Sequence, residues 1–324
     1  MYRIDDATAA SSLPAPETAG TEGYFTEGNA AAGTPATNVR GSWLNMIQEE
    51  LRAIVIAGGL TPSKTSYTQV LTAINTLIQS STSTFAAPGA TNSRVYTAAS
   101  SSFSLTASRV VAATALTGGV AYAVAGFNKT INLATTGAGG MDTGSAPTSG
   151  YVAIYAIYNP TTTTWALLAT NATSAAAPEV YAGANMPSGY TASCLVSVWG
   201  TTSTANQFRA GLQRGRRIAF PPVVVLSSST QQASFTSLSI SSSVPLNATE
   251  VFGQGNPQAS TNSNMLLHIA GDGGGVDDNY ISNSGTAISG IWRTMVSVAQ
   301  TIYYSWSNSA GTPSLGISVT GYSF

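Results

Sequence analysis

The chain has 324 residues, of which only 12 are Lys or Arg and 13 are Asp or Glu, so that charged residues make up 8%, against about 25% in an ordinary soluble domain. A net charge of -1 excludes the basic surplus typical of a nucleic-acid-binding protein, and 43% hydrophobic residues with so little charge exclude an intrinsically disordered chain. Such a chain stays soluble through hydroxyls and amides, or buries much of its surface against partners.

The first 36 residues show neither helical nor strand periodicity. They contain Pro14, Pro16 and Pro35 among several glycines, a composition that predicts an extended arm. Seven of the 13 acidic residues lie within the first 50 positions, so the N-terminal part differs chemically from the rest. The first 19 residues hold no apolar segment of the kind found in a secretory signal peptide.

Residues 37–80 are predicted to form two helices. The first runs from about Ser42, expected as its N-cap, to Ala57, where Gly58-Gly59 ends it. The second begins near Ser66, which has the spacing of a capping box with Gln69. Its heptad-like apolar positions are Tyr67, Val70, Ile74 and Leu77. This stripe either covers the core of a helical hairpin or meets identical helices on a symmetry axis.

A polar linker is expected at residues 80–84. After it, the sequence pattern changes to short segments typical of β-strands. These are Arg94–Tyr96, Phe103–Thr106, Val120–Val124, Thr130–Leu133, Tyr151–Tyr158, Trp165–Ala169, Cys194–Trp199, Phe208–Leu212, Val223–Leu226, Phe235–Ile240, Met265–Ile269, Ile291–Val298, Ile302–Trp306 and Leu315–Thr320. Turn clusters separate them, and the clearest hairpin turns at Asn159-Pro160-Thr161.

The predicted fold class is therefore mainly β on a small N-terminal α-helical base. We expect four parts: the arm, 1–36; a helical collar, 37–80; β shaft or shoulder modules, 81–221; and a β-sandwich tip, 222–324, after a boundary at Pro221-Pro222. Slender β modules rich in small residues gain burial by wrapping with identical copies, which favours a homo-oligomer.

Residues suited to catalysis are scarce. His268 is the single histidine and lies in an apolar strand-like run, which favours a structural role over a general base. Asp272 follows it, but no nucleophile elbow is present for a Ser-His-Asp site. Cys194 is the single cysteine and is expected to be buried. We expect no enzyme, no cofactor and no metal site.

The densest polar cluster is the Gly-rich segment 271–279, which carries Asp272, Asp277 and Asp278. Its oxygens are of the type that binds Ca²⁺, but the spacing is not that of an EF-hand, and an exposed flexible loop is the favoured interpretation. Aromatic residues gather in the same C-terminal hundred residues: Tyr280, Trp292, Tyr303 and Trp306. Aromatic faces beside carboxylates suit a sugar-binding site, and ordinary β-core packing is the alternative for each of them.

Four of the ten arginines lie within nine residues: Arg209, Arg214, Arg216 and Arg217. No aromatic residues alternate with these arginines and the chain is not basic overall, so a nucleic-acid-binding patch is disfavoured. A solvated hairpin or a salt-bridge site between subunits is expected, and binding of a bacterial surface phosphate stays open.

Two stretches resemble tail fibre proteins of tailed bacteriophages and prophages. The first is MYRIDDATAASSLPAPETAGTEGYFTEGNAAAGTPAT continued by VRGSWLNMIQEELRAIVIAGGLTPSKTSYTQVLTAI. The second is SGYVAIYAIYNPTTTTWALLATNATSAAAPEVYAGANMPSGYTASCLVSVW continued by RGRRIAFPPVVVLSSSTQQASFTSLSIS, and the ending LGISVTGYSF is similar to many fibre tips.

The resemblance implies a homotrimer in the virion, at the tail tip or baseplate, made in the host cytoplasm without a signal peptide. Residues 1–36 would bind tail or baseplate proteins, and the tip would bind a host receptor: a glycan, a pilus or an outer-membrane protein. No nucleic acid is expected as a partner. The alternatives are a polysaccharide-degrading tailspike and a structural baseplate component or adaptor without receptor contact.

Overall fold

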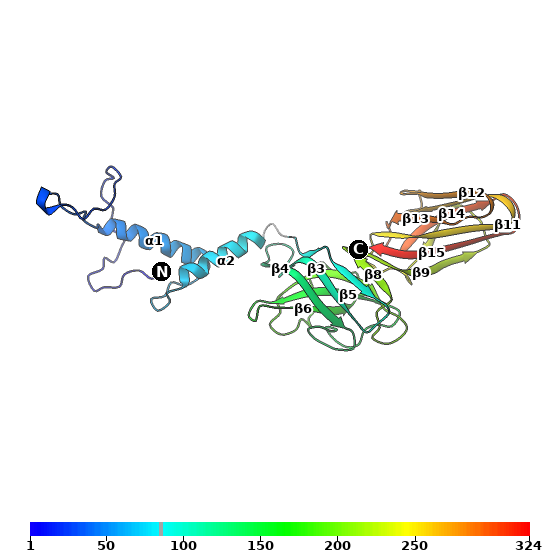
Figure 1. The fold of residues 1–324 in the computed structure, drawn as a ribbon, viewed down its shortest axis with the longest axis horizontal. Coiled ribbons are helices and arrows are strands. Elements are labelled where there is room, and N and C mark those ends of the chain that lie inside the picture. The colour runs from blue at the N-terminus through cyan, green and yellow to red at the C-terminus, as the bar shows by residue number, and fades with distance from the viewer. Residues whose placement is uncertain (84–86) are drawn as a thin grey trace. The chain divides into compact units, whose positions relative to one another are not determined.

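The computed structural model describes residues 1–83 and 87–324, which form two compact units, Met1–Thr82 and Ser83–Phe324. The first unit holds both α-helices and the second is built from β-strands (Figure 1). The predicted fold class, mainly β with a small N-terminal helical part, is confirmed. No helix among the described residues is long and apolar enough to cross a membrane.

In the N-terminal unit, α1 (Gly41–Ala57) and α2 (Gln69–Ser83) form a hairpin. Both Val55 and Ala73 are buried with no exposed surface. A Cβ added at Gly58 would stand 2.6 Å from the Cα of Ala73, so the absence of a side chain at Gly58 allows the two helices to approach.

Details of the helix ends differ from the predictions. The N-cap of α1 is Arg40, without a side-chain hydrogen bond, whereas Ser42 lies in the first turn and donates to Glu17 Oε1 at 3.0 Å. Gln69 Oε1 accepts from the backbone N–H of Ser63 rather than closing a box with Ser66. The linker predicted at residues 80–84 is wrong up to Ser83, because α2 continues through it, and residue 84 lies outside the described residues.

The arm is extended, with one 3-10 turn at Ala30–Ala32, and it contacts its own helical unit. Arg3 donates to both carboxylate oxygens of Glu49 on α1 at 2.6 Å, and Lys64 Nζ lies 2.6 Å from Asp5 Oδ2. The hydrogen bonds from Arg3 lower the pKa of the Glu49 carboxyl. Asp5 and Glu49, two of the seven acidic residues of the N-terminal part, are therefore paired with basic residues of the same chain.

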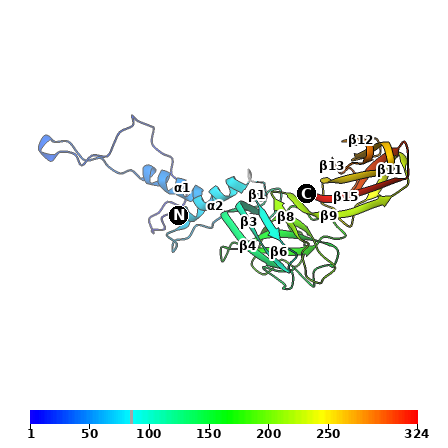
Figure 2. The ribbon, with the colours of Figure 1, turned by 45° about the vertical axis from the view of Figure 1, so that its right-hand side comes forward.

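The first β body comprises strands β1 to β8 and the start of β9. Their bounds are β1 Gly89–Thr91, β2 Arg94–Thr97, β3 Ser102–Ala113, β4 Ala121–Asn132, β5 Tyr151–Asn159, β6 Thr164–Asn171, β7 Ala192–Gly200, β8 Gly211–Arg214 and β9 Arg217–Ser228. The predicted hairpin at Asn159 is confirmed as β5–β6. Strands β5 and β7 are buried on both faces, so they form the centre of this body. Strands β3 and β4 pair along their length and run side by side in Figure 2.

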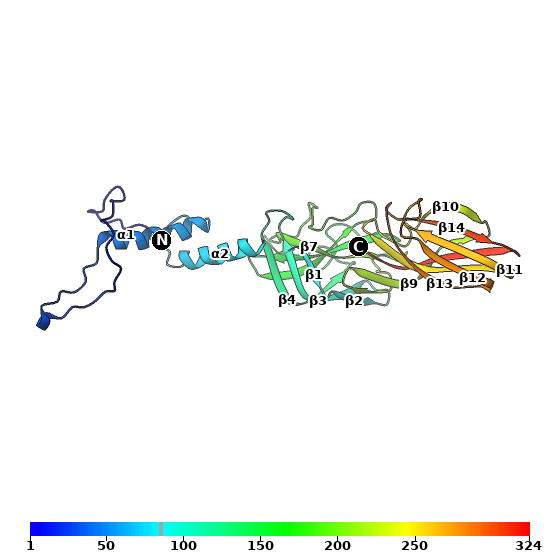
Figure 3. The same cartoon turned by 90° about the horizontal axis from the view of Figure 1, so that it is seen from above.

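The C-terminal part is a curled antiparallel sheet made of β9 and β10 Gln232–Ser239, β11 Glu250–Ala270, β12 Asn279–Ala287, β13 Gly290–Met295, β14 Thr301–Asn308 and β15 Pro313–Ser323. The 21-residue strand β11 pairs along its first half with β13 and β15, and along its second half with β12 and β14. These strands run side by side in Figure 3. Because β11 belongs to both halves, the sheet encloses one core, whose large side chains include Leu267, Trp292, Trp306 and Ile317.

Strand β9 crosses the boundary that Pro221-Pro222 predicted. It continues through both prolines, and its register with β15 shifts between Ala219 and Val223, an irregularity that accommodates residues without a backbone N–H. Tyr322 on β15 is buried and donates to the backbone carbonyl of Val198 on β7 at 2.6 Å. The two β parts therefore share buried contacts within one compact unit.

Candidate functional site

The outer face of the C-terminal sheet carries the side chains that the sequence proposed for binding. On β11, Leu267 and Ile269 are fully buried, and His268 between them points outward because side chains alternate along a strand. His268 lies directly opposite Tyr280 on β12 and Ser305 on β14. We call the outward set Phe235, His268, Asp278, Tyr280 and Tyr303 the tip face.

Two aromatic rings of the tip face, those of Phe235 and Tyr280, contact the His268 ring. The His268 and Tyr280 rings lie 5.5 Å apart, and the Phe235 ring meets His268 edge-on at 6.2 Å. His268 Nδ1 lies 2.6 Å from Asp278 Oδ2, so the carboxylate holds the imidazole in place. Tyr280 is 64% exposed. This combination offers a flat apolar surface beside charged and hydroxyl groups, which suits a saccharide.

The Gly-rich loop between β11 and β12 folds back against this face. Asp272 Oδ1 accepts the backbone N–H groups of Gly274 and Val276 at 2.9 and 2.8 Å. A Cβ added at Gly275, where φ is +83°, would come within 2.9 Å of the Phe235 ring, so the loop backbone packs closely on that ring. The loop is largely exposed, as expected, and its backbone is held by hydrogen bonds to Asp272 and by the contact with the Phe235 ring.

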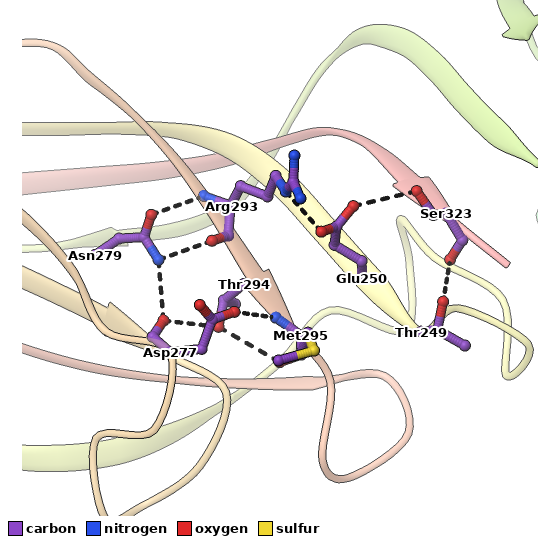
Figure 4. Close-up of polar contacts among 8 residues, drawn as sticks. All are labelled: Thr249, Glu250, Asp277, Asn279, Arg293, Thr294, Met295 and Ser323. Carbon is purple, nitrogen blue, oxygen red and sulfur yellow. Dashed lines mark hydrogen bonds and ion pairs between the residues drawn. The ribbon is translucent and has the colours of Figure 1, made fainter.

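Asp277 and Asn279 tie the same loop to β13 (Figure 4). Asp277 Oδ2 accepts the backbone N–H of Met295 at 2.7 Å. The Asn279 amide donates to the carbonyl of Arg293 at 2.8 Å and accepts from its N–H at 3.1 Å. Asp277 is in the left-handed region with φ +57°, which an Asp tolerates better than most residues. These hydrogen bonds attach the loop to the neighbouring strand β13.

Of the predicted binding residues, Asp278, Tyr280 and the partly buried Tyr303 lie on the tip face, and Asp272 and Asp277 shape the loop behind it. Trp292 and Trp306 do not belong to a surface site: they are 2% and 1% exposed, and Trp306 Nε1 donates to the Thr230 carbonyl. Both face the sheet interior, so their assignment as receptor-binding residues is wrong.

The sequence analysis did not predict Phe235 as a binding residue, and it assigned His268 a structural role. The alternation of buried Leu267 and Ile269 with His268 between them indicates that the His268 side chain lies on the outer face. The described residues contain no cluster of three or more His, Cys, Asp or Glu side chains arranged to hold a metal ion. The three aspartates of the loop point to different donors, so they form no shared ligand set.

A second surface lies in the N-terminal unit, where the arm and the first half of α1 line a groove of about 940 Å³. Phe25 packs edge-on against Trp43, with ring centroids 5.0 Å apart, and Tyr24 beside them is 98% exposed. Among the acids that line the groove, Glu22 and Glu50 form no ion pair within the described residues. The groove thus joins exposed rings to unpaired carboxylates.

The predicted helix stripe is only partly continuous. Tyr67 precedes α2 and is almost fully exposed, and Val70 is half-buried. Ile74 and Leu77 are 40% and 37% exposed, and Leu71 on the same helix is more exposed than either. Within the unit, α2 therefore buries mainly Ala73 and presents a largely apolar face outward.

No family model matches the chain. An 80-residue stretch is 41% identical to an uncharacterized protein named StfP from Escherichia coli (strain K12), a match that spans 25% of this chain and 36% of that protein. The crystal structure of the insecticidal delta-endotoxin Cry8Ea1 from Bacillus thuringiensis covers 76% of this chain and 55% of its own at 10% identity, with a TM-score of 0.17, which carries no argument about fold or function.

Proposed function

We propose that the chain is a non-enzymatic tail fibre of a bacteriophage or prophage, trimeric, attached to the tail or baseplate by its N-terminal unit and bound to a host surface receptor through its C-terminal part. The observation that carries the proposal is the contrast between the two units. The β unit has a closed core, whereas the N-terminal unit exposes aromatic and aliphatic side chains along both the arm and α2.

The exposed apolar side chains of the N-terminal unit favour permanent partners. Monomeric soluble proteins rarely expose contiguous apolar surface on this scale. Two kinds of partner fit two separate surfaces. The groove with Tyr24, Phe25 and Trp43 serves for docking to a tail protein, and the α2 face with Leu71 and Ile74 packs against the same helix of two further copies.

The tip face favours recognition of a glycan. Its rings and carboxylate resemble the lining of a sugar site, and hydrogen bonds of Asp272 and Asp277 hold the adjacent loop, which favours a low entropic cost of binding. A shallow site of this kind binds weakly by itself. Three copies in each fibre, and several fibres in each particle, raise the effective affinity by avidity.

The polysaccharide-degrading alternative is less well supported. Every pair of named strands among the described residues is antiparallel, which differs from the long parallel β-helix expected of a tailspike. All six carboxylates of the β unit already hold backbone or side-chain partners by hydrogen bonds at 2.9 Å or less: Asp142, Glu179, Glu250, Asp272, Asp277 and Asp278.

The test uses the purified full chain with a fluorescent label and bacteria from the source strain. Wild-type protein should bind the cells and compete with phage adsorption, and Tyr280→Ala should reduce the binding at least about fivefold by removing the exposed ring. Ile291→Ala truncates an apolar side chain on β13 that is even more exposed than Tyr280 and lies outside the tip face, and it serves as the control. Wild-type protein that neither binds cells nor slows adsorption contradicts the receptor-binding role, and new reducing ends in host polysaccharide would indicate the tailspike.

A further inference from the structure

Three arginines lie side by side on the surface of the β unit. Arg94 on β2 is directly opposite Arg214 on β8, and Arg214 is directly opposite Arg217 on β9. Directly opposed residues on neighbouring strands project from the same face, about 4.8 Å apart in the pairing direction. All three side chains are exposed. We call these three residues the arginine row.

No carboxylate neutralises the arginine row. None of its members forms an ion pair within the described residues. Continuing across the sheet, Arg217 is opposite Ser323, and Ser323 is opposite Glu250. Glu250, however, is held by Arg293 Nε at 2.6 Å and by the Ser323 hydroxyl at 3.3 Å (Figure 4). The nearest acid in this register is therefore already engaged.

The arrangement is unfavourable for the free chain, because like charges directly opposite each other on a sheet repel. The β unit has eight Lys and Arg residues against six Asp and Glu residues, in a chain otherwise poor in charge. Arg217 is fixed over the Phe252 ring, with its guanidinium carbon 4.1 Å from the centroid. Phe252 in turn lies over Gly321, where a Cβ would clash at 2.3 Å, so this end of the row is positioned by packing.

An apolar and aromatic row runs beside the charges. Two residues along the same strands, Tyr96 is directly opposite Leu212, and they are 75% and 39% exposed. Since the side-chain period of a strand is two residues, this pair shares the face of Arg94 and Arg214. A guanidinium binds phosphate or carboxylate through paired N–H donors, and an exposed phenol ring stacks on the apolar side of a sugar.

We propose that Arg94, Arg214 and Arg217, with Tyr96 and Leu212, form a binding site for an anionic saccharide that carries phosphate or carboxylate groups. The site is separate from the tip face, since its residues belong to β2, β8 and β9. It does not depend on the protein being a tail fibre. In a fibre, it would add a second contact with an acidic host glycan beside the one at the tip face.

A second copy of the β unit is a poorer occupant of the row. Its six acids are all engaged by groups of their own chain, as described above, and offer no spare carboxylate. Among the described residues, three exposed acids of the N-terminal unit, Glu22, Glu27 and Glu50, form neither an ion pair nor a side-chain hydrogen bond. A head-to-tail contact through these residues is an outcome that the experiment must separate from saccharide binding.

The experiment is a calorimetric titration of the full chain with four probes: a phosphorylated oligomannose, an oligogalacturonate, neutral oligomannose and inorganic phosphate. An oligonucleotide with the same charge as the charged saccharides is titrated separately for comparison. The two charged saccharides test the two anion types, and the other two probes test the sugar and the anion alone. Arg214→Gln is expected to weaken binding of a charged saccharide about tenfold or more. Arg214→Lys keeps the charge without the planar fork and should be intermediate. Lys129→Gln on β4 removes the same charge from an exposed position outside the row and should bind normally.

Four results overturn the proposal. Equal loss in Arg214→Gln and Lys129→Gln indicates nonspecific attraction, and equal affinity for inorganic phosphate alone indicates a simple anion site. Preference for an oligonucleotide of equal charge, falling steeply with salt, indicates a nucleic-acid surface. Self-association that Arg214→Gln abolishes indicates a contact between copies. Because Arg214→Gln relieves repulsion, its melting temperature should not fall, so lost binding would not reflect lost folding.

Discussion

His268 Nδ1 and Asp278 Oδ2 lie 2.6 Å apart on the outer face of the C-terminal sheet, where the carboxylate orients an imidazole that stacks on Tyr280. Asp278→Asn should leave the free energy of unfolding within about 1 kcal/mol of wild type, because both side chains are partly exposed. It should nevertheless weaken cell binding, since the ring loses its orientation. Chemical denaturation and cell binding of the same sample measure both, and unchanged binding would remove His268 and Asp278 from the site.

Arg214→Gln should stabilise the β unit. Arg214 is opposed by an arginine on each neighbouring strand, and relief of repulsion between opposed like charges is worth about 0.2–1 kcal/mol. The gain should shrink at high salt, which screens exposed charges. Urea unfolding at two salt concentrations measures it. A loss of stability at low salt would show that the arginines are structurally required rather than held against repulsion.

Gly58→Val should destabilise the helical hairpin by about 1–3 kcal/mol, because a side chain at this position meets Ala73 at 2.6 Å and overpacks the contact. Gly41→Ala is the matched control, since a Cβ at Gly41 meets nothing within 4 Å at the start of α1. Thermal unfolding followed by helical circular dichroism distinguishes them. Equal melting of the two variants would contradict the close approach of α1 and α2.

The β unit should lose stability at alkaline pH. Burial raises the pKa of the Cys194 thiol from 9.0 to about 12, and burial together with the hydrogen bond to Asp142 raises that of Tyr181 from 10.0 to about 12. In the unfolded chain both groups ionise at their ordinary values, so stability is fully present below about pH 9 and declines as pH rises towards 12, by about 1.4 kcal/mol per pH unit for each group.

Urea unfolding between pH 8 and 11 measures this decline. Cys194→Ala removes one of several contributing groups, since burial also raises the pKa of Tyr151, Tyr155 and Tyr322. It should give a shallower slope, above all between pH 9 and 10, although the truncation itself lowers stability at every pH. The native thiol should also resist alkylation, because it is buried and protonated. A slope identical to that of wild type in Cys194→Ala would contradict the assignment.

Ile74→Asp should dissociate the proposed trimer. The side chain is 40% exposed on α2, and a carboxylate there would be buried without a partner between helices. Light scattering should give about three times the 33.0 kDa chain mass for wild type and a monomer for the variant. Asn75→Asp adds the same charge at the next position of α2 and should stay trimeric. A wild-type monomer at micromolar concentration would rule out the trimer.

Much of the fold follows from local sequence. The hairpin β5–β6 combines strong β-formers with an Asn159-Pro160 turn, and both helices have regular apolar spacing. Strand β12 was missed because its residues, Asn279–Ala287, are mainly polar and small, and it is a strand only because β11 pairs with it. Tertiary pairing decides such segments, and local propensity does not.

The site residues divide in the same way. The prediction that Trp306 lies on the surface was wrong, although the sequence contains the signal that places it inside. Trp306 lies two residues after Tyr304 and four after Ile302, so in a strand its side chain lies on the same inward face as theirs. The arginine row could not have been predicted, because Arg94 and Arg214 are 120 positions apart and only the pairing of β2 with β8 brings them together. Phe235 likewise joins His268 through strand order rather than through sequence spacing.

The central claim, a fibre attached by its N-terminal unit and exposed at its C-terminus, is tested most directly by electron microscopy of tailed particles that carry a gold-labelled tag after Phe324. The proposed function predicts label at the distal end of the tail, away from the capsid, and loss of label from particles when Tyr24, Phe25 and Trp43 are replaced together by Ala. Particles that lack the label with the wild-type chain, or carry it only on the capsid, would contradict the claim.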